Sequence, residues 1–194
     1  MFLALKMAFK WRMTIQNVVV SGFLNEPVDL KKSSKVIEGS IYSHKRFPGL
    51  VLRMEKPHCT FLLFQNGKFV CTGTKLELER NRAIAEFLNV LRSKGLISNG
   101  CKCKCEVQNI VALVKVESVG VDLNKFAKEF GEVTYEPERF PAATYHTVEG
   151  KVNFLVFSNG EFVCSGTSSE EKLAEAVEEF LKHLQEKGVL HVAE

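Results

Sequence analysis

The chain contains two copies of one pattern. The motif IQNVVV at residues 15–20 recurs as VQNIVA at residues 107–112, and KRFPG at residues 45–49 recurs as ERFPA at residues 138–142. The copies lie 92 residues apart in the first case and 93 in the second. A solenoid needs about three or more repeats to bury its core. Two copies therefore predict a duplicated fold whose halves pack into one pseudo-twofold body.

The repeats divide the chain into four expected segments. Residues 1–14 form a loose N-terminal arm, residues 15–98 the first repeat, residues 99–105 a linker and residues 106–194 the second repeat. Basic residues interrupt the apolar arm before a signal-peptide core of usable length appears. No segment approaches the roughly 18 uninterrupted apolar residues of a membrane span. The sequence thus predicts a soluble, intracellular protein that does not associate with membranes.

The cysteines predict neither a disulfide framework nor a metal site. Three of the six fall inside strand-like apolar runs, where a reduced thiol acts as a small apolar side chain: Cys59, Cys71 and Cys164. The other three form CKCKC at residues 101–105. This motif lacks a C-x-x-C spacing or a nearby histidine and would make a poor tetrahedral zinc site. We interpret it as a linker, and we expect no metal or cofactor.

The small net charge of +3 conceals two oppositely charged halves. Residues 15–98 hold 13 basic and 7 acidic residues, a net charge of +6, whereas residues 106–194 hold 8 and 16, a net charge of −8. Such asymmetry predicts two kinds of partner. The alternative interpretation, an acidic helical face in contact with solvent only, accounts for much of the negative charge in the second repeat.

Each repeat is predicted to contain a strand, a short helix, three further strands and a closing helix. In the first repeat the strands are expected at residues 14–23, 50–54, 59–65 and 68–73, with the short helix beginning near Pro27. The closing helices are recognised by apolar residues recurring on one face. This order predicts an α+β fold: a continuous, curved antiparallel sheet, shaped as a saddle, with the helices on its convex side.

Turn and cap signals support these elements. Asn66 and Gly67 form a strong two-residue hairpin signal between the last two strands of the first repeat, and an Asn-Gly pair occupies the same place in the second. Gly95 and Gly188 are expected to end the closing helices. Ser169, followed by two glutamates, is a candidate N-cap residue for the helix of the second repeat.

Apolar side chains are predicted on both faces of the sheet. Side chains alternate along residues 59–65, so that Phe61 and Leu63 face the helices while Leu62 and Phe64 face away from them. The same alternation puts further residues on the helix-free face: Asn17, Val19, Val70 and Thr72, and in the second repeat Asn109, Val111, Leu155, Phe157, Val163 and Ser165. A contiguous apolar face left uncovered usually marks a binding surface.

These motifs resemble the TATA-box-binding protein family, the general transcription initiation factors of archaea and eukaryotes, from about residue 15 to residue 188. The matching segments are the two Gln-Asn strands, RFPG and RFPA, LLFQNGK and LVFSNGE, and VCTGTK and VCSGTS. Eight segments in one order and at one offset make the resemblance specific. It implies a promoter-binding protein that is not an enzyme.

The resemblance also implies the DNA contacts. In this family paired phenylalanines wedge into two base steps and kink the duplex toward its major groove; here these are Phe47 with Phe64, and Phe140 with Phe157. Minor-groove contacts are implied for Asn17, Asn109, Thr72, Ser165, Val19, Val111, Val70, Val163, Leu62 and Leu155. Because A·T and T·A pairs present only acceptors in that groove, the implied ligand is double-stranded DNA of an A/T-rich, TATA-type promoter.

The cationic residues differ between the repeats. In the first repeat the resemblance implies phosphate contacts from Lys68, Lys75, Arg46 and Arg53. The second repeat lacks a lysine or arginine at three matching positions, which hold Glu161, Ser168 and His146. Fewer cations predict a lower DNA affinity than is usual for the family, with a shallower salt dependence.

Protein partners are implied by one loop. The segment with Tyr135, Glu136 and Glu138 resembles the loop through which the family binds transcription factor B, which in turn recruits RNA polymerase. The corresponding YSHK at residues 42–45 departs from the family's usual Tyr-Asn-Pro. We expect a monomer on DNA, associated with the chromosome: in the nucleoid of an archaeal cell or in a eukaryotic nucleus.

Two other functions stay open at this point. A divergent paralogue would act as a regulator through protein partners and bind DNA weakly, as Glu161 and Ser168 suggest. An enzyme is the least favoured, because the five histidines form no ligand spacing and no nucleophile, metal or phosphate-loop motif occurs. A short N-terminal segment suits an archaeal source, although a viral or protist origin would leave a similar sequence.

Overall fold

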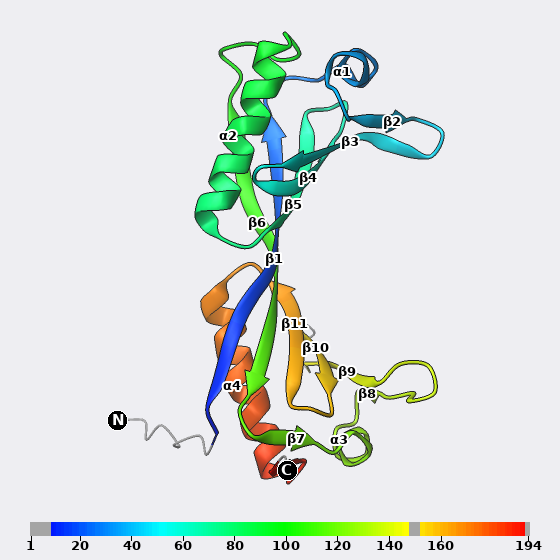
Figure 1. Ribbon diagram of the computed structural model, residues 1–194, viewed down its shortest axis with the longest axis vertical. Coiled ribbons are helices and arrows are strands. Elements are labelled where there is room, and N and C mark those ends of the chain that lie inside the picture. Colours follow the sequence, from blue (N-terminus) through cyan, green and yellow to red (C-terminus); the bar gives the residue numbers. More distant parts are fainter. Residues whose placement is uncertain (1–8, 148–151, 193–194) are drawn as a thin grey trace. The chain divides into compact units, whose positions relative to one another are not determined.

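The computed structural model describes residues 9–147 and 152–192 (Figure 1). Its helices are α1 (Leu30–Val36), α2 (Glu77–Ser93), α3 (Leu123–Glu129) and α4 (Glu170–Glu186). Its strands are β1 (Trp11–Leu24), β2 (Ile41–Ser43), β3 (Phe47–Glu55), β4 (His58–Leu63), β5 (Lys68–Thr74), β6 (Cys103–Val116), β7 (Val119–Val121), β8 (Val133–Thr134), β9 (Ala142–His146), β10 (Asn153–Phe157), β11 (Glu161–Thr167) and β12 (Leu190–Val192). Within the described ranges, no helix is long and apolar enough to cross a membrane.

Ten of these strands form one sheet, in the order β2-β3-β4-β5-β1-β6-β11-β10-β9-β8. The pairings within each repeat are antiparallel. Short turns join β2 to β3, β3 to β4, β4 to β5 and β10 to β11, as expected for hairpins. The predicted fold class, an α+β arrangement of two repeats with an antiparallel sheet, is confirmed.

The chain forms two compact units. The first-repeat unit spans Asn17–Asn109, and the second-repeat unit comprises the described residues up to Gln16 and from Ile110 onward. Both long strands take part in both units. In the first-repeat unit the Asn25 amide donates to the Lys102 carbonyl at 3.1 Å, and in the second-repeat unit the Glu117 amide donates to the Lys10 carbonyl at 2.9 Å.

The long strands correct two expected boundaries. β1 begins at Trp11, so residues 11–14 are part of the sheet and not of a loose arm. β6 begins at Cys103, so most of the CKCKC motif is strand and not linker. Sequence reasoning missed both extensions, although WRMT at residues 11–14 and CKC at residues 103–105 alternate apolar and polar residues as a strand does.

In the first-repeat unit one helix covers one face of the sheet (Figure 1). The Phe87 ring of α2 stacks on Phe61 of β4, with centroids 4.1 Å apart and planes 8° apart, and contacts Phe69 of β5 at 5.1 Å. All three side chains are fully buried. Burying an aromatic side chain of this size contributes about 1.5–3 kcal/mol. This cluster therefore holds α2 against the sheet.

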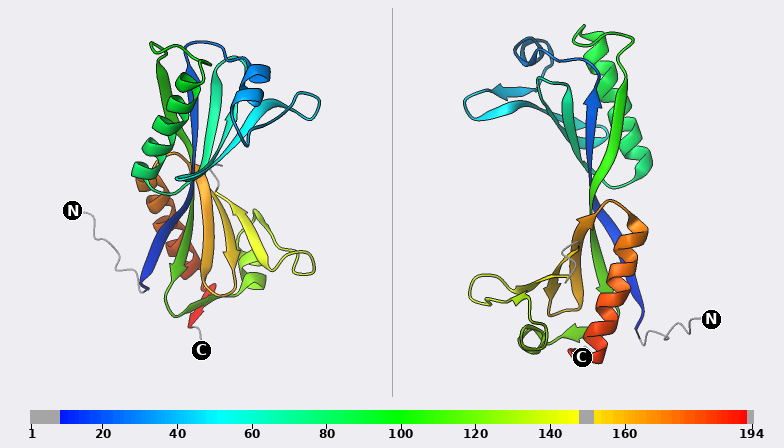
Figure 2. Two further views of the ribbon diagram at one scale, coloured as in Figure 1. Left: turned by 45° about the horizontal axis from the view of Figure 1, so that its top comes forward. Right: turned by 180° about the vertical axis from the view of Figure 1, so that it is seen from behind.

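The second-repeat unit repeats this arrangement at equivalent positions (Figure 2). The Phe180 ring of α4 stacks on Phe154 of β10 at 4.2 Å, and Phe162 of β11 meets it edge-on at 5.8 Å. Tyr145 of β9 adds a further stacked contact at 5.3 Å. The helix is thus packed on one face of its own unit, which leaves the opposite face of that unit free of helix.

The helix ends follow the predicted cap chemistry. The Ser169 hydroxyl accepts the Lys172 amide at the start of α4. Gly95, with φ of 61°, ends α2; its amide donates to the Arg92 carbonyl and the Leu96 amide to the Leu91 carbonyl. This pattern is the Schellman motif, which glycine favours because it adopts positive φ without strain. Gly188 has the same conformation after α4.

The hairpin turns differ from the prediction. The loop between β4 and β5 has three residues, because Phe64 pairs with Lys68 and the Gly67 amide donates to the Phe64 carbonyl at 3.0 Å. Only Gly67, with φ of 84°, is left-handed there. This is a type I turn followed by a glycine bulge and not the two-residue turn, in which Asn66 would also need positive φ.

Several smaller elements also differ from expectation. The first short helix begins at Leu30 with Asp29 as its N-cap, three residues after the Pro27 start that we predicted. β2 and β8 at the sheet edges were not predicted, because strands of three and two residues carry too little periodicity. β12 pairs with β7 in a separate two-stranded sheet, which the sequence did not indicate.

Candidate nucleic-acid interface

The helix-free face of each unit is lined by half-buried side chains. In β4 the burial alternates, with Phe61 and Leu63 buried under the helix and Leu62 half-buried on the other face. β5 alternates in the same way. The same side of the sheet carries the expected set, all of intermediate exposure: Asn17, Val19, Val70, Thr72, Asn109, Val111, Leu155, Phe157, Val163 and Ser165. The predicted facing of these strands is confirmed.

Each unit holds a pair of phenylalanines at its outer strands. In the first-repeat unit the rings of Phe47 and Phe64 meet edge-to-face, with centroids 5.8 Å apart. In the second-repeat unit Phe140 and Phe157 meet in the same manner at 6.3 Å. Phe140 is 49 % exposed, which is unusual for so large an apolar side chain. The structure therefore brings together each of the two expected pairs.

A glycine makes room for the first pair. A Cβ atom on Gly49 would lie 2.7 Å from Cε1 of Phe47 and 3.1 Å from Cε1 of Phe64. The second repeat has Ala142 at the matching position, paired with Phe157. The methyl group of alanine thus occupies space in one unit that the rings occupy in the other, and Phe140 is more exposed than the half-buried Phe47.

The side-chain amide of Asn17 is held in one orientation. Its Oδ1 accepts the Gly73 backbone amide at 2.8 Å and the Thr72 hydroxyl at 3.2 Å, and its Nδ2 lies 3.0 Å from the Thr72 Oγ1. Gly73 sits at a bulge, where φ is 106° and the β1–β5 register shifts. The bulge points the Gly73 amide at Asn17. Nδ2 donates one of its two N–H groups to the Thr72 hydroxyl oxygen, so its second N–H is the donor that this side chain can offer to a ligand.

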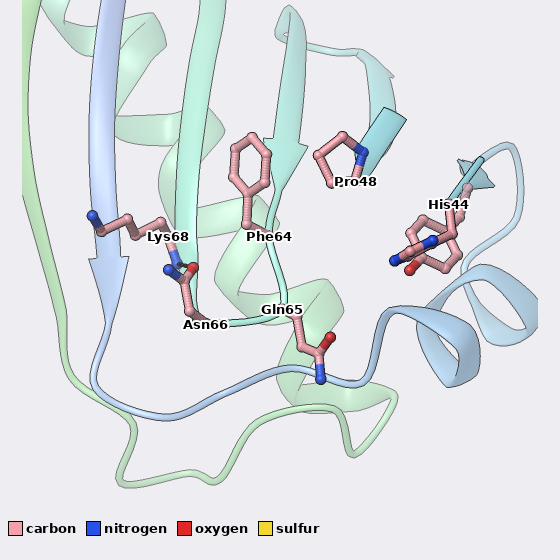
Figure 3. Close-up of a pocket in the computed structure, with 7 residues that line it drawn as sticks. His44, Pro48, Phe64, Gln65, Asn66 and Lys68 are labelled. Carbon is pink, nitrogen blue, oxygen red and sulfur yellow. Dashed lines mark hydrogen bonds between the residues drawn. The ribbon is translucent and has the colours of Figure 1, made fainter. Parts of the chain in front are cut away.

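A hollow of about 460 Å³ lies beside Phe64 in the first-repeat unit (Figure 3). Pro48 lies on one side of the Phe64 ring and Lys68 on the other, and His44 lines the far wall. Lys68 stands opposite Phe23 on β1, which is 46 % exposed. Sequence reasoning missed Phe23, although its position on the alternating β1 strand already indicated the helix-free face.

The other expected cations of the first repeat are exposed. Arg53 on β3 stands opposite Thr60, on the same face as Thr72. Arg46 lies in the turn before β3, and Lys75 directly follows β5. All of these side chains can reach a ligand on the helix-free face or at its rim.

The second-repeat unit has a different arrangement of charge. Glu161, which stands where the first repeat has Lys68, forms a salt bridge with Lys115 at 3.1 Å. The hydrogen bond from Lys115, then Asn159 and the charges of Lys115 and Arg12 hold the pKa of Glu161 below its ordinary value. Two cations therefore surround one carboxylate. Sequence reasoning missed Lys115, although it lies 92 residues after Phe23, on the partner strand of Glu161.

Two further positions of the second repeat also lack the cation that the first repeat has. They hold His146 and Ser168, where the first repeat has Arg53 and Lys75. His146 stands opposite Asn153 and is hydrogen-bonded to it through Nδ1. Ser168 is exposed before α4. At these places the second-repeat unit carries an imidazole and a hydroxyl group in place of the first repeat's guanidinium and ammonium groups.

The loop before Phe140 is compact. The Glu136 carbonyl accepts the amides of Arg139 and Phe140, and its carboxylate forms a 2.9 Å salt bridge with Arg139. Tyr135 is half-buried, whereas Glu138 is exposed. The loop therefore presents Glu138 as a carboxylate to solvent, while the charge of Glu136 is offset by its neighbour.

Two tandem α+β repeats, each with an apolar helix-free sheet face and a phenylalanine pair, are matched by one family model. The model is described as "Transcription factor TFIID (or TATA-binding protein, TBP)" and matches residues 12–94 and 104–187. The chain belongs to the TATA-binding-protein family. This is a family of transcription factors and not of enzymes.

Individual relatives agree with this assignment. The TATA-box-binding protein of Archaeoglobus fulgidus is 38 % identical over 184 residues, covering 93 % of this chain and 98 % of the relative. That of Picrophilus torridus is 37 % identical over 181 residues, covering 92 % and 97 %. Among solved structures, Methanococcus jannaschii TBP is similar with a TM-score of 0.82 and 32 % identity, covering 90 % of this chain and 99 % of that chain.

Proposed function

We propose that the protein binds A/T-rich, TATA-type promoter DNA through the minor groove, bends it and so initiates transcription. The observation that carries this proposal is the uncovered face itself. In each unit a helix-free sheet face presents half-buried valine and leucine with an edge-to-face phenylalanine pair at its end. A contiguous apolar face left uncovered usually marks a binding surface.

The phenylalanine pairs supply the wedges. Inserting an apolar side chain between base pairs costs a few kcal/mol of stacking, which burial of the opened minor groove on an apolar sheet offsets. Phe140 is already half-exposed, so it needs little rearrangement before insertion. Phe157 supports it from the neighbouring strand. In the first-repeat unit Phe64 supports Phe47 in the same manner.

Asn17 supplies a preference for A/T pairs. Its oxygen accepts the Gly73 amide and one N–H of Nδ2 donates to Thr72, so the group left for a ligand is the second N–H of Nδ2. A·T and T·A pairs present only acceptors in the minor groove, whereas guanine adds an amino donor that would meet this donor unfavourably. Asn109 and Ser165 are proposed to act in the second half of the site, beside Val111 and Val163. Flexible TA steps favour the same sequences because they cost less to bend.

Phosphate contacts are proposed for both units. In the first-repeat unit Lys68, Lys75, Arg46 and Arg53 would neutralise backbone charge. In the second-repeat unit we add Lys115 and Arg12. Their two positive charges together exceed the single negative charge of Glu161. The low affinity expected from Glu161 alone is therefore partly offset. Each phosphate neutralised adds about 0.9 to the salt dependence of binding.

The second-repeat loop is the proposed docking site for a transcription factor B-type protein, through which RNA polymerase is recruited. Exposed Glu138 and the half-buried ring of Tyr135 offer a charged and an apolar contact side by side. The net charge of −8 in the second repeat favours a basic partner at this end. We further propose that one copy of the chain occupies one DNA site.

The decisive experiment is a salt titration of binding to a TATA-type duplex and to a G/C-rich duplex of the same length. Selective binding to the first, lost in Phe140→Ala and Phe157→Ala, would support the proposal. Weak binding that is equal on both duplexes and unchanged in the variants would reject it. That outcome would favour the alternative of a paralogue acting through protein partners, in which transcription factor B is still bound.

A further inference from the structure

Two cysteine thiols lie in contact at the start of β6. The Sγ atoms of Cys103 and Cys105 are 3.4 Å apart. They come from alternate residues of one strand, so both point to the same face. Cys103 is half-buried and Cys105 is exposed. Neither thiol has a role in the proposed DNA-binding function.

The other thiols are not comparable sites. Cys59, Cys71 and Cys164 are at most 3 % exposed, so no ion from solvent can reach them. Burial raises the pKa of Cys71 to about 12 and that of Cys164 to about 11. Cys101 is buried, and its thiol is engaged with Glu26. Among the described cysteines, only the pair on β6 combines mutual contact with access to solvent.

We propose that Cys103 and Cys105 form a two-sulfur chelate site for a thiophilic divalent cation such as Zn²⁺. Two Zn–S bonds of about 2.3 Å at a tetrahedral angle place the sulfur atoms about 3.8 Å apart. The observed separation is within a small side-chain rotation of that value. Softer sulfur ligands favour such cations over Mg²⁺ or Ca²⁺.

Binding of the cation at these two thiols requires loss of their protons and no oxidation. Each thiol loses its proton to solvent, the two thiolates donate to the cation, and a divalent ion with two thiolates is neutral.

The site is open on the solvent side. No group of three or more cysteine, histidine or acidic side chains suited to a metal occurs among the described residues. The two sulfurs therefore leave two tetrahedral positions for water or for an external ligand. This arrangement differs from a closed structural zinc site, which uses four protein ligands.

The test is a Zn²⁺ titration of the full chain against a chromophoric chelator. We expect one equivalent of Zn²⁺ in the wild type, and loss of that equivalent in both Cys103→Ser and Cys105→Ser. Cys101→Ser is the matched control from the same motif and should keep it.

A second measurement needs no variant. Zn²⁺ should protect Cys103 and Cys105 from alkylation in the wild type, as read from peptide masses. The proposal is overturned if stoichiometric binding survives in the two serine variants, if Cys101→Ser loses it while remaining folded, or if Zn²⁺ gives no protection. DNA binding is measured separately with the TATA-type duplex. The metal proposal and the DNA-binding proposal are therefore tested independently, and rejection of one does not reject the other.

Discussion

Lys115 Nζ lies 3.1 Å from Glu161 Oε1, across the β6–β11 pair on the helix-free face. The first repeat has Phe23 and Lys68 at the matching positions, also paired across neighbouring strands. The positive charge has thus moved from one strand to the next between the two repeats. Both side chains of the salt bridge remain accessible, at 45 % and 30 % exposure, so a phosphate can approach Lys115.

Lys115→Gln should weaken binding to the TATA-type duplex and reduce the slope of log affinity against log salt by about 1, because one phosphate contact is lost. Glu161→Gln should strengthen binding, since it removes a carboxylate from the face. The measurement is a fluorescence anisotropy titration at four salt concentrations. Lys68→Gln is the matching variant in the first repeat, and it should lower the slope by a similar amount because Lys68 is also a proposed phosphate contact. An unchanged slope in Lys115→Gln would exclude this lysine as a phosphate contact.

Phe157→Ala and Phe154→Ala should separate function from folding. Phe154 is buried under α4, so its truncation should cost about 3–5 kcal/mol in the free energy of unfolding. Phe157 is half-buried on the other face, so its truncation should cost about 1 kcal/mol but abolish DNA bending. Chemical denaturation and energy transfer between dyes at the duplex ends measure the two effects. A Phe157→Ala variant that bends DNA normally would contradict the wedge.

Asn17→Asp should reverse the hydrogen-bonding character of the face. The carboxylate keeps an acceptor for the Gly73 amide but loses the outward N–H donor. We expect a 10- to 100-fold loss of affinity for the A/T site, in line with about 1–3 kcal/mol for a specific base contact. Thr72→Val removes the neighbouring hydroxyl, itself an expected groove contact, and should cost less affinity because the Asn17 donor remains. Equal affinities for wild type and Asn17→Asp would show that this amide does not read the groove.

Gly49→Ala should displace the first phenylalanine pair. The added methyl group would stand 2.7 Å from the Phe47 ring, and overpacking of this kind typically costs about 1–3 kcal/mol. Thermal unfolding should show a lower midpoint, and the exposed area of Phe47 should rise toward that of Phe140. The reciprocal change, Ala142→Gly, should lower stability only slightly, by about 0.5–1 kcal/mol. A Gly49→Ala protein as stable as the wild type would show that the two rings have room to move.

The sequence predicts most of the fold because the two repeats support one another. The alternation in β4, the cap at Ser169 and the glycine at Gly95 each have a local cause that side-chain chemistry reveals. The pairing of β1 with β6 joins residues far apart in sequence. The alternating segments WRMT and CKC could therefore be assigned to the sheet only once the strand beside each was known. The salt bridge of Lys115 was missed for the same reason, because it depends on which strand lies beside β11.

The course of the two long strands bears on how such a protein can arise from a smaller one. Each unit completes its sheet with a segment that belongs, in sequence, to the other repeat: residues up to Gln16 in one case, and the start of β6 in the other. A chain with a single repeat would leave that sheet edge unpaired, which exposes backbone groups prone to association. Such an ancestor would have needed a second copy of itself to supply the missing strand. The tandem chain supplies that strand within one polypeptide, and its two halves carry opposite net charge.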